Sequence, residues 1–207
     1  MRFKFTLFVW CAVITSAFAG GSYTSLAEAL KNPADVKSLN LSGNSLAALP
    51  ESIGQLVNLE RLNVSSNNLV TLPKALFALN KLTYLNLTGN KLKAIPSTIS
   101  KLKNLEELET GFNHMASLPK EIGTLTKLTR LVVSKNNLKA LPAEMTQLTS
   151  LEIIDLSYNL FTSIPDATTG MKNLRTIDVS FNKQLSAYPA QKPTLNENEM
   201  HAHQQKY

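Results

Sequence analysis

The stretch LERLNVSSNNLVTLPKALFAL, at residues 59–79, decides the fold because the chain repeats its pattern every 23 residues. Six successive units place an apolar residue in seven fixed slots each, and of these 42 slots only Thr110 and Thr168 are polar. A proline follows the turn leucine or isoleucine in all six units. Asparagine recurs at the same interval, at Asn44, Asn67, Asn90, Asn113, Asn136, Asn159 and Asn182. Such self-similarity predicts a solenoid, in which each repeat buries its apolar side against its neighbours.

Each unit predicts two elements of secondary structure. Its first part predicts a short strand, because alternate leucines such as Leu39 and Leu41 face one side of an extended chain. The apolar pair after the proline, such as Ile53 and Leu56, is spaced as a short helical or 3-10 turn requires. We therefore predict an α/β solenoid. It is a curved arc with a parallel β-sheet of seven strands on the concave face and short helical or 3-10 turns on the convex face.

The recurring asparagines are predicted to be structural. After each strand the chain turns away, and the backbone N–H and C=O groups at that corner lose their partners in the sheet. A buried asparagine amide can donate and accept hydrogen bonds at once, so it can satisfy both kinds of group. We expect the seven asparagines to form a hydrogen-bonded ladder with no catalytic role.

The repeat Leu-x-x-Leu-x-Leu-x-x-Asn-x-Leu-x-x-Leu-Pro-x-x-Ile-x-x-Leu resembles the leucine-rich repeat family over residues 36–189. Cysteine-bonded caps are usual in secreted animal and plant members, whereas Cys11 is the only cysteine here. The chain is more similar to cysteine-free solenoids exported by bacteria. The resemblance implies a non-enzymatic module that recognises a protein or cell-surface ligand through its concave face. The alternative is a cell-surface structural or adhesion component without one specific ligand.

The first nineteen residues predict a signal peptide. Arg2 and Lys4 precede an apolar run at 5–14, and an Ala-x-Ala site ends at Ala19. The run is too short for a membrane span, which needs about 20 apolar residues. We therefore expect a secreted or periplasmic protein, without a transmembrane segment after cleavage and from a bacterial source.

The two ends of the solenoid are expected to differ. Residues 20–35 predict an N-terminal cap, with a helix over 26–31 opened by the capping box of Ser25 and Glu28. The seven repeats cover residues 36–189, and the polar residues 190–207 predict a disordered tail. The spacing slips by one residue after Asn182, so the last strand is predicted to leave an open edge that permits weak self-association.

Positions that the repeat does not dictate should carry any binding specificity. In the fourth repeat Glu106, Glu107 and Glu109 lie between two arginines of other strands, and three aromatic residues share the slot before the asparagine. Aromatic and arginine side chains are typical of interface hot spots. Two alternatives stay open: the glutamates pair with the arginines, and the aromatic rings only cover one another. The candidate partner-binding residues are Arg61, Tyr84, Glu107, Glu109, Phe112, Arg130, Lys135, Asp155, Tyr158 and Phe181.

Other classes of site find little support in the sequence. No phosphate loop and no hydrolase or metalloprotease motif occurs, so we predict no catalytic residue and no cofactor. The histidines are His114, His201 and His203, and no carboxylate or thiol is held beside the last two, so no metal site is predicted. The net charge is +6, and four lysines are expected to line one edge of the arc, as a solvated surface or, in the alternative, as a contact for anionic surface polymers or nucleic acid. The four lysines are Lys81, Lys103, Lys127 and Lys172. Export argues against a nucleic-acid partner.

Overall fold

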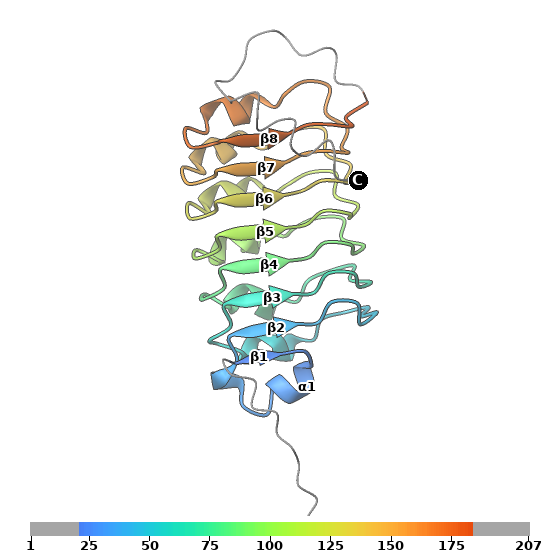
Figure 1. Ribbon diagram of the computed structural model, residues 1–207, viewed down its shortest axis with the longest axis vertical. Coiled ribbons are helices and arrows are strands. Elements are labelled where there is room, and N and C mark those ends of the chain that lie inside the picture. Colours follow the sequence, from blue (N-terminus) through green and yellow to red (C-terminus); the bar gives the residue numbers. More distant parts are fainter. Residues whose placement is uncertain (1–20, 184–207) are drawn as a thin grey trace, which may run out of the picture.

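Each turn of the chain contributes one short strand to a single parallel sheet in residues 21–183, the part that the computed structural model describes. The strands follow one another in chain order without any crossover (Figure 1). Pairing joins equivalent residues of successive repeats, as in Leu62 with Leu85. The strands are β1 (Ser22–Tyr23), β2 (Ser38–Asn40), β3 (Arg61–Asn63), β4 (Tyr84–Asn86), β5 (Glu107–Glu109), β6 (Arg130–Val132), β7 (Ile153–Asp155) and β8 (Thr176–Asp178).

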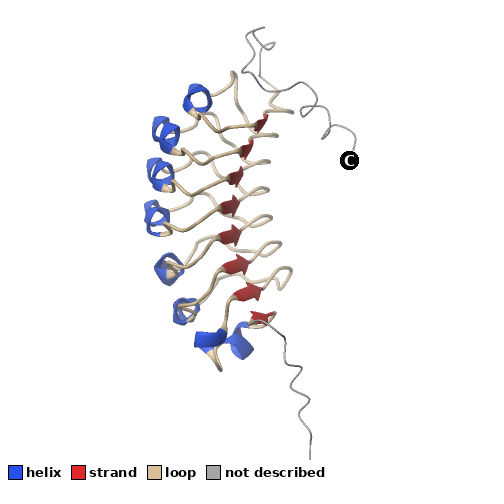
Figure 2. Ribbon diagram, turned by 60° about the vertical axis from the view of Figure 1, so that its left-hand side comes forward, coloured by secondary structure: helices blue, strands red, loops and turns tan. Residues whose placement is uncertain are grey.

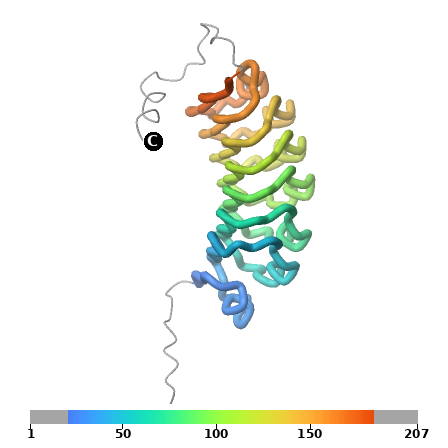
Figure 3. The backbone as a smooth tube through the Cα atoms, turned by 90° about the vertical axis from the view of Figure 1, so that its right-hand side faces the viewer, coloured from blue at the N-terminus to red at the C-terminus, as the bar shows by residue number. Residues whose placement is uncertain are grey.

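Short helices form the opposite, convex side of the arc, while the strands line the concave side (Figure 2). A 3-10 helix begins directly after the proline in each of the six complete repeats. The turns stack without a break from β1 to β8 (Figure 3). The predicted solenoid is therefore confirmed. The helices are α1 (Leu26–Ala29), η1 (Pro33–Asp35), η2 (Glu51–Gln55), η3 (Lys74–Ala78), η4 (Ser97–Lys101), η5 (Lys120–Thr124), η6 (Ala143–Gln147) and η7 (Asp166–Gly170).

The N-terminal end differs from the prediction in two respects. The sheet gains an eighth strand, β1, which the repeat pattern does not contain because a two-residue strand has no apolar alternation. The helix α1 ends two residues before the predicted boundary, and the chain forms η1 from Pro33 onward. Ser25 caps α1, accepting a hydrogen bond from the Glu28 N–H at 3.5 Å. Ala29 is buried within the hydrophobic core, and half-buried Leu26 and Leu30 pack against it.

One continuous core of leucine, isoleucine and valine runs the length of the arc between sheet and helices. Its two polar members are both buried but differ in their hydrogen bonds. The Thr168 hydroxyl donates to the Pro165 carbonyl at 2.8 Å. The Thr110 hydroxyl, fully buried, reaches only the Val132 carbonyl at 3.4 Å. Of the two buried threonines, Thr110 therefore has the weaker hydroxyl hydrogen bond.

The asparagines form a ladder that ties each repeat to the one before it. The Asn136 amide donates to the carbonyls of Thr110 and Val133, both at 3.0 Å. It donates to Ser134 at 3.3 Å, and its oxygen accepts from the Met115 N–H at 2.9 Å. The backbone N–H and C=O groups at the corner after the strand thereby receive their hydrogen bonds from a buried side chain. The same pattern recurs at Asn67, Asn90, Asn113, Asn159 and Asn182.

Asn44 is the exception, and its assignment to the ladder is wrong. Its side chain is exposed and makes no hydrogen bond to residues 21–183. The physical reason lies in the direction of the ladder: each rung reaches back to the preceding repeat, and only the cap precedes Asn44. The Asn67 amide accordingly takes over the first corner, accepting from the Leu46 N–H at 2.9 Å.

The predicted signal peptide at 1–19, the predicted tail at 190–207, Cys11, His201 and His203 lie outside the described residues. Self-association through the C-terminal edge stays a prediction, since the residues that follow Lys183 also lie outside this range.

The ladder predicts a sharp contrast between two asparagine-to-alanine variants. Asn136→Ala leaves several buried backbone groups without partners, and we expect it to lower the free energy of unfolding by about 2–4 kcal/mol. Asn44→Ala, the matched control, should change it by less than about 0.5 kcal/mol because that side chain is exposed. Urea unfolding followed by circular dichroism measures both. Equal losses would contradict a ladder that begins at Asn67.

The two core threonines predict opposite effects of the same substitution. Thr110→Val removes a hydroxyl with a poor partner, and valine occupies the equivalent slot at Val64 and Val133, so we expect a gain of about 0.5–1 kcal/mol. Thr168→Val removes a well-formed hydrogen bond and should cost about 1 kcal/mol. Chemical denaturation of the two variants side by side gives the comparison, and a destabilised Thr110→Val would show that its long hydrogen bond matters.

Candidate binding surface

Two rows of side chains point away from the core on the concave face. The strand pairing holds equivalent residues side by side, so each row runs along the whole arc. The first row holds the first residue of each strand and the second row holds the third. The first row is Ser38, Arg61, Tyr84, Glu107, Arg130, Ile153 and Thr176, and the second is Asn40, Asn63, Asn86, Glu109, Val132, Asp155 and Asp178.

The second row is largely a second structural ladder, which sequence analysis missed. In five repeats an asparagine or aspartate there accepts a hydrogen bond from the backbone N–H two residues later, at 2.8–3.0 Å. This Asx turn closes the end of the strand. The signal was present in the sequence as Asn or Asp in five of seven slots. It also gives the candidate residue Asp155 a structural role, since its Oδ1 accepts from both the N–H and the hydroxyl of Ser157.

Glu109 and Val132 interrupt this second ladder in the fourth and fifth repeats. The longer Glu109 side chain turns along the sheet instead. Its carboxylate accepts from the Asn86 amide at 2.8 Å and lies 3.7 Å from the Arg130 Nε. Val132 has no polar group with which to cap a strand. The centre of the concave face therefore lacks the Asx turn that closes the strands on either side of it.

The first row brings charged and aromatic side chains together at the same place. The Arg61 guanidinium lies over the Tyr84 ring, 4.1 Å from its centroid, and the Asn86 amide donates to the Tyr84 hydroxyl at 3.1 Å. Partial burial raises the pKa of Tyr84 above its ordinary value, against the Asn86 hydrogen bond, which lowers it. Glu107 forms no ion pair with any residue in 21–183. Pairing of the glutamates with arginines therefore holds for Glu109 alone.

The residue before each asparagine lies in the turn that follows the strand, at the rim of the concave face. Here the aromatic ridge, defined as Phe112, Lys135, Tyr158 and Phe181, forms a continuous stack. The Lys135 ammonium lies 4.0 Å from the Phe112 centroid and 4.7 Å from that of Tyr158. Tyr158 and Phe181 stack at 4.2 Å with their planes 14° apart. Tyr158 and Phe181 cover one another and Lys135 covers Phe112, yet the rings of Phe112, Tyr158 and Phe181 remain 53%, 43% and 63% exposed.

The ridge occupies a strained backbone position. All seven equivalent residues have positive φ, and two of them are glycines, Gly43 and Gly89. Phe112, Tyr158 and Phe181 have φ between 53° and 57°. A left-handed conformation costs a residue with a side chain about 1 kcal/mol or more. Bonds between repeats hold it, as from the Tyr158 N–H to the Ser180 carbonyl at 2.9 Å. Large exposed rings at such positions motivate a functional hypothesis.

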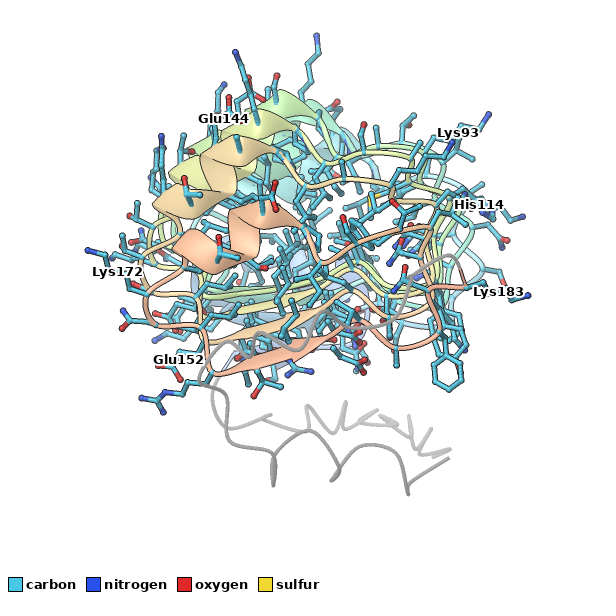
Figure 4. All side chains as sticks on the ribbon, turned by 90° about the horizontal axis from the view of Figure 1, so that it is seen from above. Lys93, His114, Glu144, Glu152, Lys172 and Lys183 are labelled. Atoms are coloured by element: carbon cyan, nitrogen blue, oxygen red, sulfur yellow. The ribbon has the colours of Figure 1, made fainter. Side chains whose placement is uncertain are left out.

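The two edges of the arc carry different side chains. Viewed from above, Glu152 and Lys172 lie on one edge, and Lys93, His114 and Lys183 lie on the other (Figure 4). On the first edge, Lys81 and Lys127 each donate to an asparagine of the preceding repeat at 2.7 Å, so part of the predicted lysine stripe is structural.

Within residues 21–183, no three histidine, cysteine or acidic side chains are grouped as metal ligands would be. No helix in that range has the length and apolar character of a membrane span.

Comparison with known proteins agrees with this geometry. A family model described as "Leucine-rich repeat region" matches residues 21–114, and one described as "Leucine rich repeat" matches residues 126–183. A search of curated proteins finds no match.

Three solved structures illustrate the likeness. The ectodomain of the plant receptor kinase GASSHO1/SCHENGEN3 from Arabidopsis thaliana is 36% identical over 77% of this chain and 20% of its own, with a TM-score of 0.67. PEPR1–AtPEP1 is 29% identical over 72% of this chain and 22% of its own, with a TM-score of 0.64. Listeria monocytogenes InlP is 28% identical over 70% of this chain and 39% of its own, with a TM-score of 0.61. The chain thus spans well under half of each.

The raised pKa of Tyr84 predicts a difference between the folded and unfolded chain at alkaline pH. As the pH rises, the unfolded chain loses this proton first, near the ordinary tyrosine pKa of about 10. The stability contributed by the neutral phenol is therefore complete below that pH and is lost as the pH rises through the folded-state pKa. The tyrosinate absorbance of the wild type minus that of Tyr84→Phe isolates this group. Its midpoint should be higher in buffer than in concentrated urea, and equal midpoints would contradict the burial.

Proposed function

The chain belongs to the leucine-rich repeat family, and from that premise we propose that it is a non-enzymatic recognition module whose concave face binds a protein or peptide ligand. The proposed site is centred on the third to fifth repeats. Its principal members are Arg61, Tyr84, Glu107, Glu109 and Arg130.

The observation that carries this proposal is the interruption of the Asx ladder. In five repeats an asparagine or aspartate of the second row caps the end of the strand, whereas Glu109 and Val132 occupy the same position in two repeats without such a cap. Loss of a backbone cap costs stability, so a ligand contact is a physical reason for a different side chain there. The replacement occurs beside Tyr84, Glu107 and Arg130, which offer an aromatic ring and both signs of charge on a firm sheet. Aromatic and arginine side chains of this kind dominate binding energies.

The solved structures support the same class of function. The GASSHO1/SCHENGEN3 ectodomain is in complex with CASPARIAN STRIP INTEGRITY FACTOR 2, and PEPR1 is in complex with AtPEP1. By analogy we propose a polypeptide ligand for this chain. Because the likeness covers 20% and 22% of those chains, the proposal takes from them a mode of recognition and no particular ligand.

Export is part of the proposal. Residues 1–19 have the organisation of a signal peptide, and the described solenoid resembles an ectodomain. The ligand is therefore sought among secreted, periplasmic or surface proteins.

A capture experiment with matched variants tests the concave face. The purified chain is immobilised and exposed to the envelope and medium of its native host, and bound proteins are identified by mass spectrometry. The concave variant combines Tyr84→Ala, Glu107→Ala and Arg130→Ala. If the face binds a ligand through hot spots, each captured partner should bind this variant about tenfold more weakly or worse.

The control changes an equal number of side chains on the convex helices, with the same net charge. It combines Lys101→Ala, Glu121→Ala and Gln147→Ala, and it should retain the partner. Thermal unfolding confirms that both variants are folded. A saturable partner that both variants bind equally would refute a site on the concave face. Diffuse, unsaturable retention of many proteins would favour the alternative function, a structural or adhesion component.

A further inference from the structure

We propose that the edge of the solenoid that follows the strands is a second binding surface, specific for an acidic peptide segment that carries one large apolar side chain. This inference rests on the proposed recognition function and extends it from the concave face to its rim. The aromatic ridge and the basic side chains around it form the surface.

The ionisable side chains of this edge are all basic. In every repeat, the six residues that begin just before the ladder asparagine contain no aspartate or glutamate. The edge carries exposed Lys91, Lys93, His114, Lys139 and Lys183, together with Lys135 of the ridge. Figure 4 shows Lys93, His114 and Lys183 projecting from this edge. No lysine of this group forms an ion pair within residues 21–183. A surface of this kind favours a ligand with several negative charges.

The ridge adds to the positive character of the edge. Lys135 lies over the faces of Phe112 and Tyr158, and Phe181 covers another face of Tyr158. Ring faces are the negative parts of an aromatic side chain, and ring edges are the positive parts. These contacts occupy both faces of Tyr158 and one face each of Phe112 and Phe181, so the ring edges and one face of each phenylalanine remain for a ligand. Anionic groups can therefore contact Lys135 and the ring edges of the ridge.

An apolar depression lies at the C-terminal end of the ridge. It has a volume of about 300 Å³ and is lined by Asn136, Tyr158, Asn159, Leu160, Phe181 and Lys183. Leu160 is 39% exposed, which is unusual among the leucines of residues 21–183. A volume at the lower limit for small-molecule pockets suits a single side chain. The depression thus selects a large apolar group, and Lys183 places a positive charge beside it.

The same contacts disfavour two other polyanions. Single-stranded nucleic acids bind by stacking bases on a series of free aromatic faces, but both faces of the central ring, Tyr158, are occupied by Lys135 and Phe181. An acidic polysaccharide has no side chain to fill the depression. A peptide offers both carboxylates and an apolar side chain on one flexible backbone.

The extent of the surface sets the length of the ligand. The basic side chains run from the third repeat to the seventh, which at about 4.8 Å per strand is roughly 19 Å. An extended peptide rises about 3.3 Å per residue, so roughly six residues cover this distance. A peptide of seven residues is therefore a suitable probe.

Fluorescence anisotropy with labelled heptapeptides tests the proposal on the full chain. The main probe has six glutamates around a central tryptophan. One control probe replaces the tryptophan by serine, and another replaces the glutamates by lysines. At moderate ionic strength the main probe should bind about fivefold or more tightly than the serine probe, and the lysine probe should not bind. The binding should weaken as salt is added, because exposed charges are screened.

Matched variants locate the binding. Lys139→Gln with Lys183→Gln removes two charges from the proposed edge, and Lys103→Gln with Lys172→Gln removes two from the opposite edge. The first pair should weaken the main probe about tenfold, and the second by less than about twofold. Phe181→Ser should abolish the preference for tryptophan over serine.

Equal losses from the two pairs, or no preference for tryptophan in the wild type, would overturn the inference. Tighter binding of a thymidine oligonucleotide or of polygalacturonate than of the main probe would overturn it in favour of those polymers. The concave variant Tyr84→Ala, Glu107→Ala and Arg130→Ala keeps this edge intact and should bind the main probe normally. Failure of the edge and failure of the concave face are therefore distinguishable.

Discussion

The buried asparagine amide is the interaction on which the rest of the structure depends. At each corner it accepts from one backbone N–H and donates to carbonyls of two successive repeats, as Asn136 does. Without it, the turn from strand to convex side would bury unpaired peptide groups, each at a cost comparable to a lost hydrogen bond. Because each amide spans two repeats, it also sets their relative position. The apolar core then fills the space between sheet and helices, and stacking supplies the stability that no single repeat has.

Both proposed binding surfaces are consequences of this corner. Upstream of it, the strand ends must be closed, and most repeats do this with an Asx turn. Where no Asx turn forms, at Glu109 and Val132, the second-row residue is free to differ from asparagine or aspartate. Immediately before the asparagine the backbone adopts positive φ in all seven repeats, and in the five where the residue is not glycine its side chain lies at the rim. A repetitive framework thereby presents a few variable side chains at fixed spacing, and recognition rests on those few.

The architecture was predictable from the sequence, but parts of the site were not. A 23-residue period and apolar alternation suffice for parallel strands, convex 3-10 turns and a buried asparagine ladder. The eighth strand was not predictable, because β1 is defined by backbone pairing with β2 and not by a pattern of its own. Asn44 matches the pattern and yet lies exposed, because a rung requires a complete repeat before it. The capping role of Asp155 was hidden in a slot that looked variable, although its preference for Asn and Asp was visible.

The sequence by itself determined what a periodic pattern can encode: the repeat, its apolar core, its polar corners and the order of the side chains along the arc. Tertiary structure alone decided how those side chains meet. Stacking brought Lys135 between the rings of Phe112 and Tyr158, 23 residues away on either side, and left Glu107 without an ion pair in the described chain while Glu109 joined Arg130. The physical reason is that periodicity states which residues share a row, whereas distances, ring orientations and exposure arise only when the repeats are packed.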